Sequence, residues 1–190
     1  ISSDNLDEIS GISFQSDNVI WVHNDSGDKS ILYRLNRNGD TEQQLQLPEI
    51  NARDWEDMAI IKKDKMVTLY IADIGDNKER YSKYPIHIVS IKKDSECHDG
   101  SHRIESIKTI FVDYGTLGSR DAEGLAVDPK SEDIYVLTKG RGGIAYLLRK
   151  KSPHEHKEHR SMEVLHQFEI PVINGLNVYR FTGLDIAKNG

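Results

Sequence analysis

The chain has 190 residues, with 25 Lys or Arg and 31 Asp or Glu, and its formal net charge of −6 argues against nucleic acid or an anionic membrane as a partner. The length suffices for one large domain with a buried core, and no apolar run approaches the roughly 18–20 residues of a membrane span. The single cysteine, Cys97, excludes an internal disulfide framework and a thiolate metal cluster.

Short apolar runs follow one another along the chain, each bounded by Gly, Pro, Asn or Asp. They predict strands at 11–14, 19–23, 31–35 and 42–47, then at 57–61, 68–72, 86–91 and 107–112, and then at 124–128, 134–137, 145–149 and 163–170. No stretch keeps a helical period over three turns. We expect two polar interruptions, an insertion at 92–103 and a charged hairpin loop at 150–160, in an all-β chain.

One motif, Arg-Asp-x-Glu followed by an apolar run, occurs at 53–60 and again at 120–127, with weaker echoes from Glu8 and from Arg180. Four strands between successive copies are typical of a β-propeller blade, whereas a sandwich leaves the repeat unexplained. We therefore expect a single β-propeller domain over 1–190 with four-stranded antiparallel blades. The blades are expected at about 8–50, 53–115 and 120–172, with the first strand of a fourth blade at about 180–190.

Three blades and one strand cannot close a ring. We therefore expect that the chain is an N-terminal portion of a longer domain, or that its exposed edges associate with the missing blades or with another chain.

The meander within each blade predicts which loops share a face. Because strand two returns to the side from which strand one starts, the loop after strand two lies beside the Arg-Asp-x-Glu motif. This face should collect the following side chains as candidates for binding: Asn24, Asp25, Asp28, Arg53, Asp73, Asp76, Asn77, Arg120 and Lys139.

Carboxylates that converge on one funnel repel each other and need arginines, protons or a bound cation. A hard cation, Ca²⁺ first, suits oxygen ligands, and the predicted ligands are Asp54, Glu56, Asp57, Asp121 and Glu123. Two other interpretations stay open. The arginines of the motif would pair locally with the acids and lock adjacent blades together, and Asp and Asn also favour tight turns for local reasons.

His23 lies beside the 24–28 loop and is the histidine best placed for general acid–base catalysis. A strand-end histidine with its hydrogen bonds satisfied is the other interpretation.

Several blocks, taken in order, resemble a family of largely uncharacterised secreted β-propeller proteins that is distantly similar to β-propeller phytases. The blocks are Glu8-Ile9-Ser10-Gly11-Ile12, Trp21-Val22-His23-Asn24-Asp25-Ser26-Gly27-Asp28, Arg53-Asp54-Trp55-Glu56-Asp57-Met58-Ala59, Tyr70-Ile71-Ala72-Asp73-Ile74-Gly75-Asp76-Asn77, Asp121-Ala122-Glu123-Gly124-Leu125, Tyr135-Val136-Leu137-Thr138-Lys139 and Thr182-Gly183-Leu184-Asp185-Ile186. The resemblance implies about six blades and a chain that continues past Asp185.

The phytase kinship implies calcium held by acidic residues in the central channel and attack on phosphate esters through bound water. Paraoxonases and gluconolactonases are a second analogy, with a central Ca²⁺ held by Glu and Asn ligands. In this chain Glu56, Glu123, Asn24 and Asn77 match that ligand set.

Two functions are therefore expected and left open. The first is a metal-dependent hydrolase of an ester, lactone or phosphate ester, and the second is a non-catalytic propeller that binds a protein or glycan, with any metal structural. The chain begins with Ile1 rather than Met and has one glycosylation sequon at Asn24-Asp25-Ser26. We therefore expect a trimmed chain or a mature form after signal removal, and a secreted protein.

Overall fold

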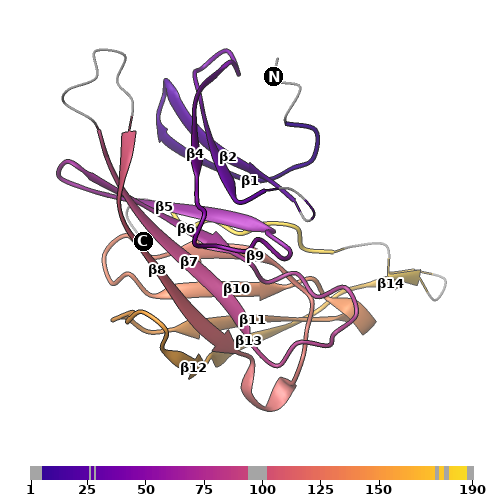
Figure 1. Ribbon diagram of the computed structural model, residues 1–190. Coiled ribbons are helices and arrows are strands. Elements are labelled where there is room, and N and C mark those ends of the chain that lie inside the picture. The colour runs from indigo at the N-terminus through magenta and orange to yellow at the C-terminus, as the bar shows by residue number, and fades with distance from the viewer. Residues whose placement is uncertain are drawn as a thin grey trace.

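The computed structural model describes residues 6–25, 27, 29–93, 102–173, 176–177 and 180–187 and shows an all-β chain. The first sheet has the order β1-β2-β3-β4, with strands β1 (Ile9–Ser16), β2 (Val19–Asn24), β3 (Ile31–Leu35) and β4 (Thr41–Gln46). All three pairings are antiparallel. Each strand overlaps one predicted from the apolar runs, which confirms an up-and-down meander for this unit (Figure 1).

The second sheet repeats this meander with longer strands: β5 (Asp57–Lys63), β6 (Met66–Ala72), β7 (Tyr84–Lys93) and β8 (His102–Asp113). The polar segment 92–103 was expected to interrupt the pattern. Instead the β7–β8 ladder continues into it, with Lys92 opposite Arg103. Residues 94–101 lie outside the described residues, and so does Cys97.

The third sheet has the order β13-β11-β10-β9 and consists of β9 (Ala122–Val127), β10 (Ile134–Thr138), β11 (Ile144–Lys150) and β13 (Glu163–Glu169). A two-residue pair follows, β14 (Val172–Ile173) and β15 (Leu176–Asn177). The helices in the described part of the chain are the single 3₁₀ turns η1 (Gly115–Leu117) and η2 (Arg141–Gly143), and neither could span a bilayer.

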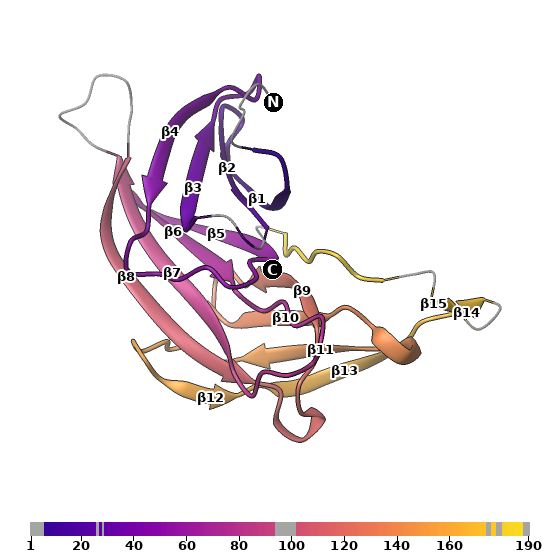
Figure 2. The ribbon, with the colours of Figure 1, turned by 45° about the vertical axis from the view of Figure 1, so that its right-hand side comes forward.

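The first strands of the three sheets lie side by side on the inner side of the fold, while β4, β8 and β13 lie outward (Figure 2). Hydrogen bonds join these inner strands. Ser13 Oγ of β1 donates to Met58 O of β5 at 2.7 Å, and Leu125 N of β9 donates to Asp57 Oδ2 of β5 at 2.8 Å. Successive sheets are therefore fixed to each other at the strand that follows each Arg-Asp-x-Glu motif.

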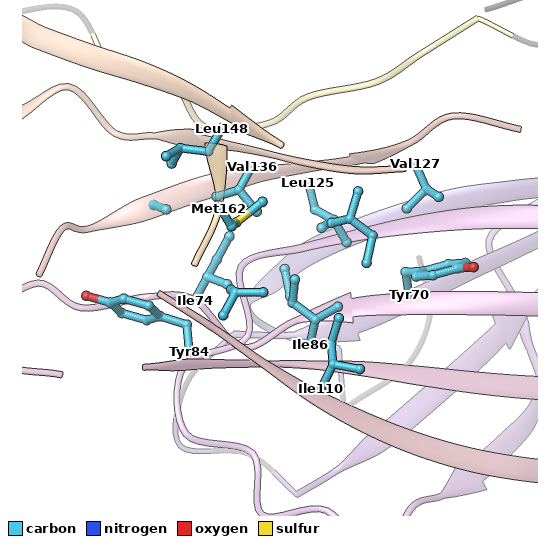
Figure 3. Packing of buried hydrophobic residues seen from close by; sticks show 14 of the residues in the cluster. Tyr70, Ile74, Tyr84, Ile86, Ile110, Leu125, Val127, Val136, Leu148 and Met162 are labelled. Carbon is cyan, nitrogen blue, oxygen red and sulfur yellow. The ribbon is translucent and has the colours of Figure 1, made fainter. Parts of the chain in front are cut away.

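Two apolar clusters fill the spaces between the sheets. One joins the first and second sheets and includes Trp21 and Trp55. The other joins the second and third sheets, where Ile86 and Ile110 face Leu125 from the opposite side (Figure 3). Burial of such side chains contributes about 1.5–3 kcal/mol each, so the second sheet is stabilised on both faces.

The segment 150–160 joins β11 to β13 and is largely an exposed loop, as its charge predicts, but its two ends are fixed by specific contacts. Lys150 is 5% exposed, and its ammonium reaches Glu158 Oε1 at 2.6 Å and His154 Nδ1 at 2.9 Å. The next residues form β12 (His159–Ser161), which pairs in parallel with the end of β8 in the second sheet. A charged segment is thus folded here because its charges pair internally.

The first strand of a fourth unit, expected at about 180–190, is not formed in the described residues 180–187. This segment still lies against the inner strands. Leu184 N donates to Asp57 Oδ2 at 3.2 Å, and Phe181 N donates to Lys139 O at 3.3 Å. It therefore occupies the position beside β9 without a ladder of its own.

Candidate metal centre

Five carboxylates from three sheets meet where the chain enters β5 and β9. We call them the acidic cluster: Asp25, Asp54, Glu56, Asp121 and Glu123. In each of two triads, Asp25–Asp54–Glu56 and Glu56–Asp121–Glu123, one oxygen per residue lies within 4.8 Å of the others. Asp25 follows β2, Asp54 and Glu56 precede β5, and the other two flank the start of β9. The two triads share one residue, Glu56.

Glu56 is 7% exposed, and its carboxylate receives no hydrogen bond or ion pair from the described residues. The pKa of Glu56 is raised to about 9, first by burial and then by the charges of Glu123, Asp25 and Asp54, against a smaller lowering by Lys139. A buried carboxylate without a donor is costly unless a proton or a cation neutralises it. Glu56 is therefore the residue of the acidic cluster that most lacks a partner.

Lys139, directly after β10, is the main cation of the cluster. Its ammonium binds Glu123 Oε1 and lies 3.6 Å from Asp121 Oδ2. Burial lowers the pKa of Lys139, but the hydrogen bond to Glu123 and the charge of Asp121 outweigh this, so the pKa lies above its ordinary value. Lys139 therefore stays protonated and places a positive charge on one side of the cluster.

Asp121 is 2% exposed and uses its two oxygens differently. Oδ1 accepts the backbone N–H of Asp76 at 2.9 Å. Oδ2 receives no hydrogen bond within the described chain and faces Lys139 at 3.6 Å and Arg141 at 3.4 Å. One oxygen holds the loop, and the other stays available to a cation.

Gly75 has no side chain, and this leaves space for the carboxylates of the acidic cluster. A Cβ at this position would lie 2.3 Å from Glu56 Oε1 and 2.4 Å from Asp54 Cγ. The backbone of the 73–77 loop thus approaches the carboxylates more closely than a residue with a side chain would allow.

Asp73 was expected on the binding face, but its carboxylate is fully buried and holds backbone. Oδ1 accepts the N–H of Asp54 at 2.9 Å, and Oδ2 accepts that of Arg53 at 3.2 Å. Arg53 in turn donates to Asp73 O at 2.9 Å, with its guanidinium over the Tyr81 ring at 3.9 Å. This contact matches the interpretation of local pairing: the arginine and Asp73 fix the turn that presents Asp54 and Glu56.

Asp57 and Asp76 also bind backbone and lie outside the two triads. Asp57 accepts N–H groups of Met58, Leu125 and Leu184. Burial raises the pKa of Asp57 to about 6, while these three donors oppose the rise. Asp76 accepts N–H groups within its own loop and the hydroxyl of Tyr84, the latter at 3.0 Å. Both acids fix the scaffold around the cluster.

His23, the candidate for acid–base catalysis, is fully buried in β2. Its Nδ1 is 2.8 Å from Asn24 O, and its ring packs edge-on against Trp55 at 5.2 Å. Burial lowers the pKa of His23, so the neutral imidazole is favoured. Gly11 leaves room for the imidazole ring, since a Cβ at residue 11 would lie 2.1 Å from His23 Nε2. The ring lies in the packed interior beneath the cluster.

The other candidates in the described part of the chain make contacts of their own. Asn77 accepts two bonds from Arg141, which also faces Asp121. Asn24 is 6% exposed, and its Nδ2 donates to Asp7 Oδ1 at 3.4 Å. The Arg120 guanidinium donates to the adjacent Ser119 O at 2.7 Å. Asp28 lies outside the described residues.

Gly75 and Tyr81 are site residues that were not among the predicted ones. A glycine between two acids of the Asp-Ile-Gly-Asp block was the available signal for Gly75, whereas the contact of Tyr81 with Arg53 carries no sequence signal. Arg141 lies in the loop after the second strand of its unit, which the meander places on this face, and it pairs with Asp121. Comparison of the chain with protein-family models and with curated protein sequences finds no match.

Proposed function

We propose that the three sheets are consecutive blades of a β-propeller and that its inner face binds a divalent cation, Ca²⁺ first, at the acidic cluster. The observation that carries the proposal is Glu56, a buried carboxylate that is shared by both triads and has no hydrogen-bond or ion-pair partner among the described residues. Asp, Glu and neighbouring carbonyl oxygens are the ligands that Ca²⁺ prefers. The close approach of Gly75 keeps Glu56 and Asp54 together, as a preorganised site requires.

The proposed activity of this site is hydrolysis of an ester, a lactone or a phosphate ester. A cation at the cluster would polarise the substrate oxygen. His23 is poorly placed to exchange a proton with a bound substrate, because it lies inside the packed interior. Secretion is part of the same proposal and is tested by localising the full-length chain.

Calcium binding is tested by calorimetric titration and thermal melting of the chain and of Glu56→Gln. We expect Ca²⁺ to raise the melting temperature of the wild type, by the equivalent of about 2.7 kcal/mol at a hundredfold excess over Kd, and EDTA to reverse the shift. Glu56→Gln should lose the response. Glu105→Gln, on the exposed β8 strand, is the matched control. A wild-type melt indifferent to Ca²⁺ and EDTA would contradict the proposal.

A non-catalytic propeller that binds a protein or glycan is the second candidate. It is favoured by the rim, where Tyr81 is 43% exposed and lies under the Arg53 guanidinium. Exposed aromatic rings beside arginine are typical of binding surfaces. Assays of the calcium-loaded chain on ester, lactone and phosphate-ester substrates separate the two candidates. Hydrolysis that Glu56→Gln abolishes supports the first, and calcium binding without turnover supports the second.

A further inference from the structure

Lys139 and a cation bound at the acidic cluster would need the same oxygens. The ammonium already binds Glu123 Oε1 and faces Asp121 Oδ2 at 3.6 Å, and both residues belong to the triad completed by Glu56. A protonated lysine has three donors and no lone pair, so it cannot serve as a ligand. It can only neutralise these carboxylates or leave them.

We propose that Lys139 is a tethered counter-cation of this site and that it exchanges with the divalent ion, leaving Glu123 when the ion binds. The inference rests on the proposed function, because it assigns a regulation to the same cluster. In the ion-free state the ammonium holds Glu123 and Asp121 together against their mutual repulsion. In the ion-bound state these oxygens turn to the ion.

The surroundings of Lys139 suit such an exchange. Its side chain is 15% exposed, so a path to solvent is open. The segment that follows, Gly140 to Gly143, is rich in glycine, and Gly142 has a φ of 72° with nothing within 4 Å of its Cβ position. A backbone of this kind adjusts at low cost.

Arg141 provides an internal comparison. Its guanidinium also faces Asp121 Oδ2, at 3.4 Å, but it donates to Asn77 O and Oδ1 and, within the described residues, forms no ion pair with Glu123. Arg141 therefore contributes positive charge near the cluster without occupying the oxygen that a cation needs. An effect of charge alone would appear at both residues, whereas exchange would appear at Lys139.

The test is calorimetric titration of Ca²⁺ into the wild type, Lys139→Met, Arg141→Met and the remote control Lys63→Met, whose lysine pairs with Glu132. We expect Lys139→Met to bind Ca²⁺ about tenfold to a hundredfold more tightly than the wild type, the cost of breaking one charge-assisted hydrogen bond. Arg141→Met should gain much less, and Lys63→Met should match the wild type. Circular dichroism and melting establish that each variant is folded.

The outcomes separate the two proposals. If the wild type binds Ca²⁺ and Lys139→Met binds it no more tightly, or gains no more than Arg141→Met, the exchange is wrong and the cation site stands. If neither the wild type nor Lys139→Met binds Ca²⁺, the proposed function itself fails.

A second measurement does not depend on the variant folding. Nitrogen-15 spectra of the lysine ammonium groups in the wild type should show the Lys139 signal move to its solvent-exposed position as Ca²⁺ is added. A Lys139 signal that stays unchanged in the calcium-bound protein overturns the exchange.

Discussion

Gly75 is the residue whose lack of a side chain most directly shapes the acidic cluster. The atoms that an added methyl group would meet are the carboxyl ends of Glu56 and Asp54. Such ends swing aside more easily than backbone does, so the fold should tolerate the methyl group while the carboxylates move apart.

For Gly75→Ala we therefore expect a stability loss of at most about 1–2 kcal/mol together with a loss of calcium affinity of about tenfold or more. Urea denaturation and calorimetric titration measure the two effects. Gly183→Ala is the matched control, because nothing lies within 4 Å of its Cβ position. Unchanged affinity in Gly75→Ala would show that the close approach does not matter to the site.

Glu56 should also make the stability of the ion-free protein depend on pH. Its folded-state pKa of about 9 lies above its ordinary value of 4.5, so the folded chain keeps a proton that the unfolded chain has released. Stability therefore falls as pH rises between these values, by up to about 1.4 kcal/mol per pH unit. Denaturation with EDTA from pH 5 to pH 9 should show this fall in the wild type and a flatter profile in Glu56→Gln. Identical profiles would contradict the assignment.

At the scale of elements, the strands were predictable and the contacts between them were not. Short runs rich in Val, Ile, Leu and Tyr, bounded by turn residues, located all twelve strands of the three meanders. β12 escaped prediction, because its three residues, His159 to Ser161, are polar and pair with a strand distant in sequence. The Arg-Asp-x-Glu repeat correctly indicated acids at the entries of β5 and β9. It could not show that Asp57 binds backbone while Asp54 joins a triad, because both are aspartates of the same motif.

Asp57 of β5 connects its own strand to β9 and to the 180–187 segment through hydrogen bonds. Its carboxylate accepts N–H groups from β9 and from the 180–187 segment as well as from its own strand. Asp57→Ala leaves these buried donors without an acceptor and should cost about 2–4 kcal/mol. Urea denaturation measures the change. Asp17→Ala, at an exposed turn, is the control and should change stability by less than about 0.5 kcal/mol. Equal urea midpoints for the two variants would show that the hydrogen bonds of Asp57 do not stabilise the fold.

At the scale of the whole molecule, the two largest apolar clusters lie on the two faces of the second sheet, whereas the outer faces of the first and third sheets carry smaller clusters, which include Tyr33 and Leu137. Beside the cluster of the first sheet, β1 exposes Ile12 at 50% and Phe14 at 59%. These faces are where the proposed propeller would receive its neighbouring blades. The repeat indicated such an arrangement because each unit needs a neighbour to bury its apolar face.

The parallel pairing of β12 with β8 has a consequence for how the chain behaves among other copies of itself. β8 is the outermost long strand of the second sheet, and an open strand edge is a template for adding strands from another molecule. Lys157 N donates to Thr109 O, and Phe111 N donates to Glu158 O, so the chain fills the final part of this edge from within. The last residues of the charged segment thus cover a part of the edge that a strand of another molecule could otherwise join.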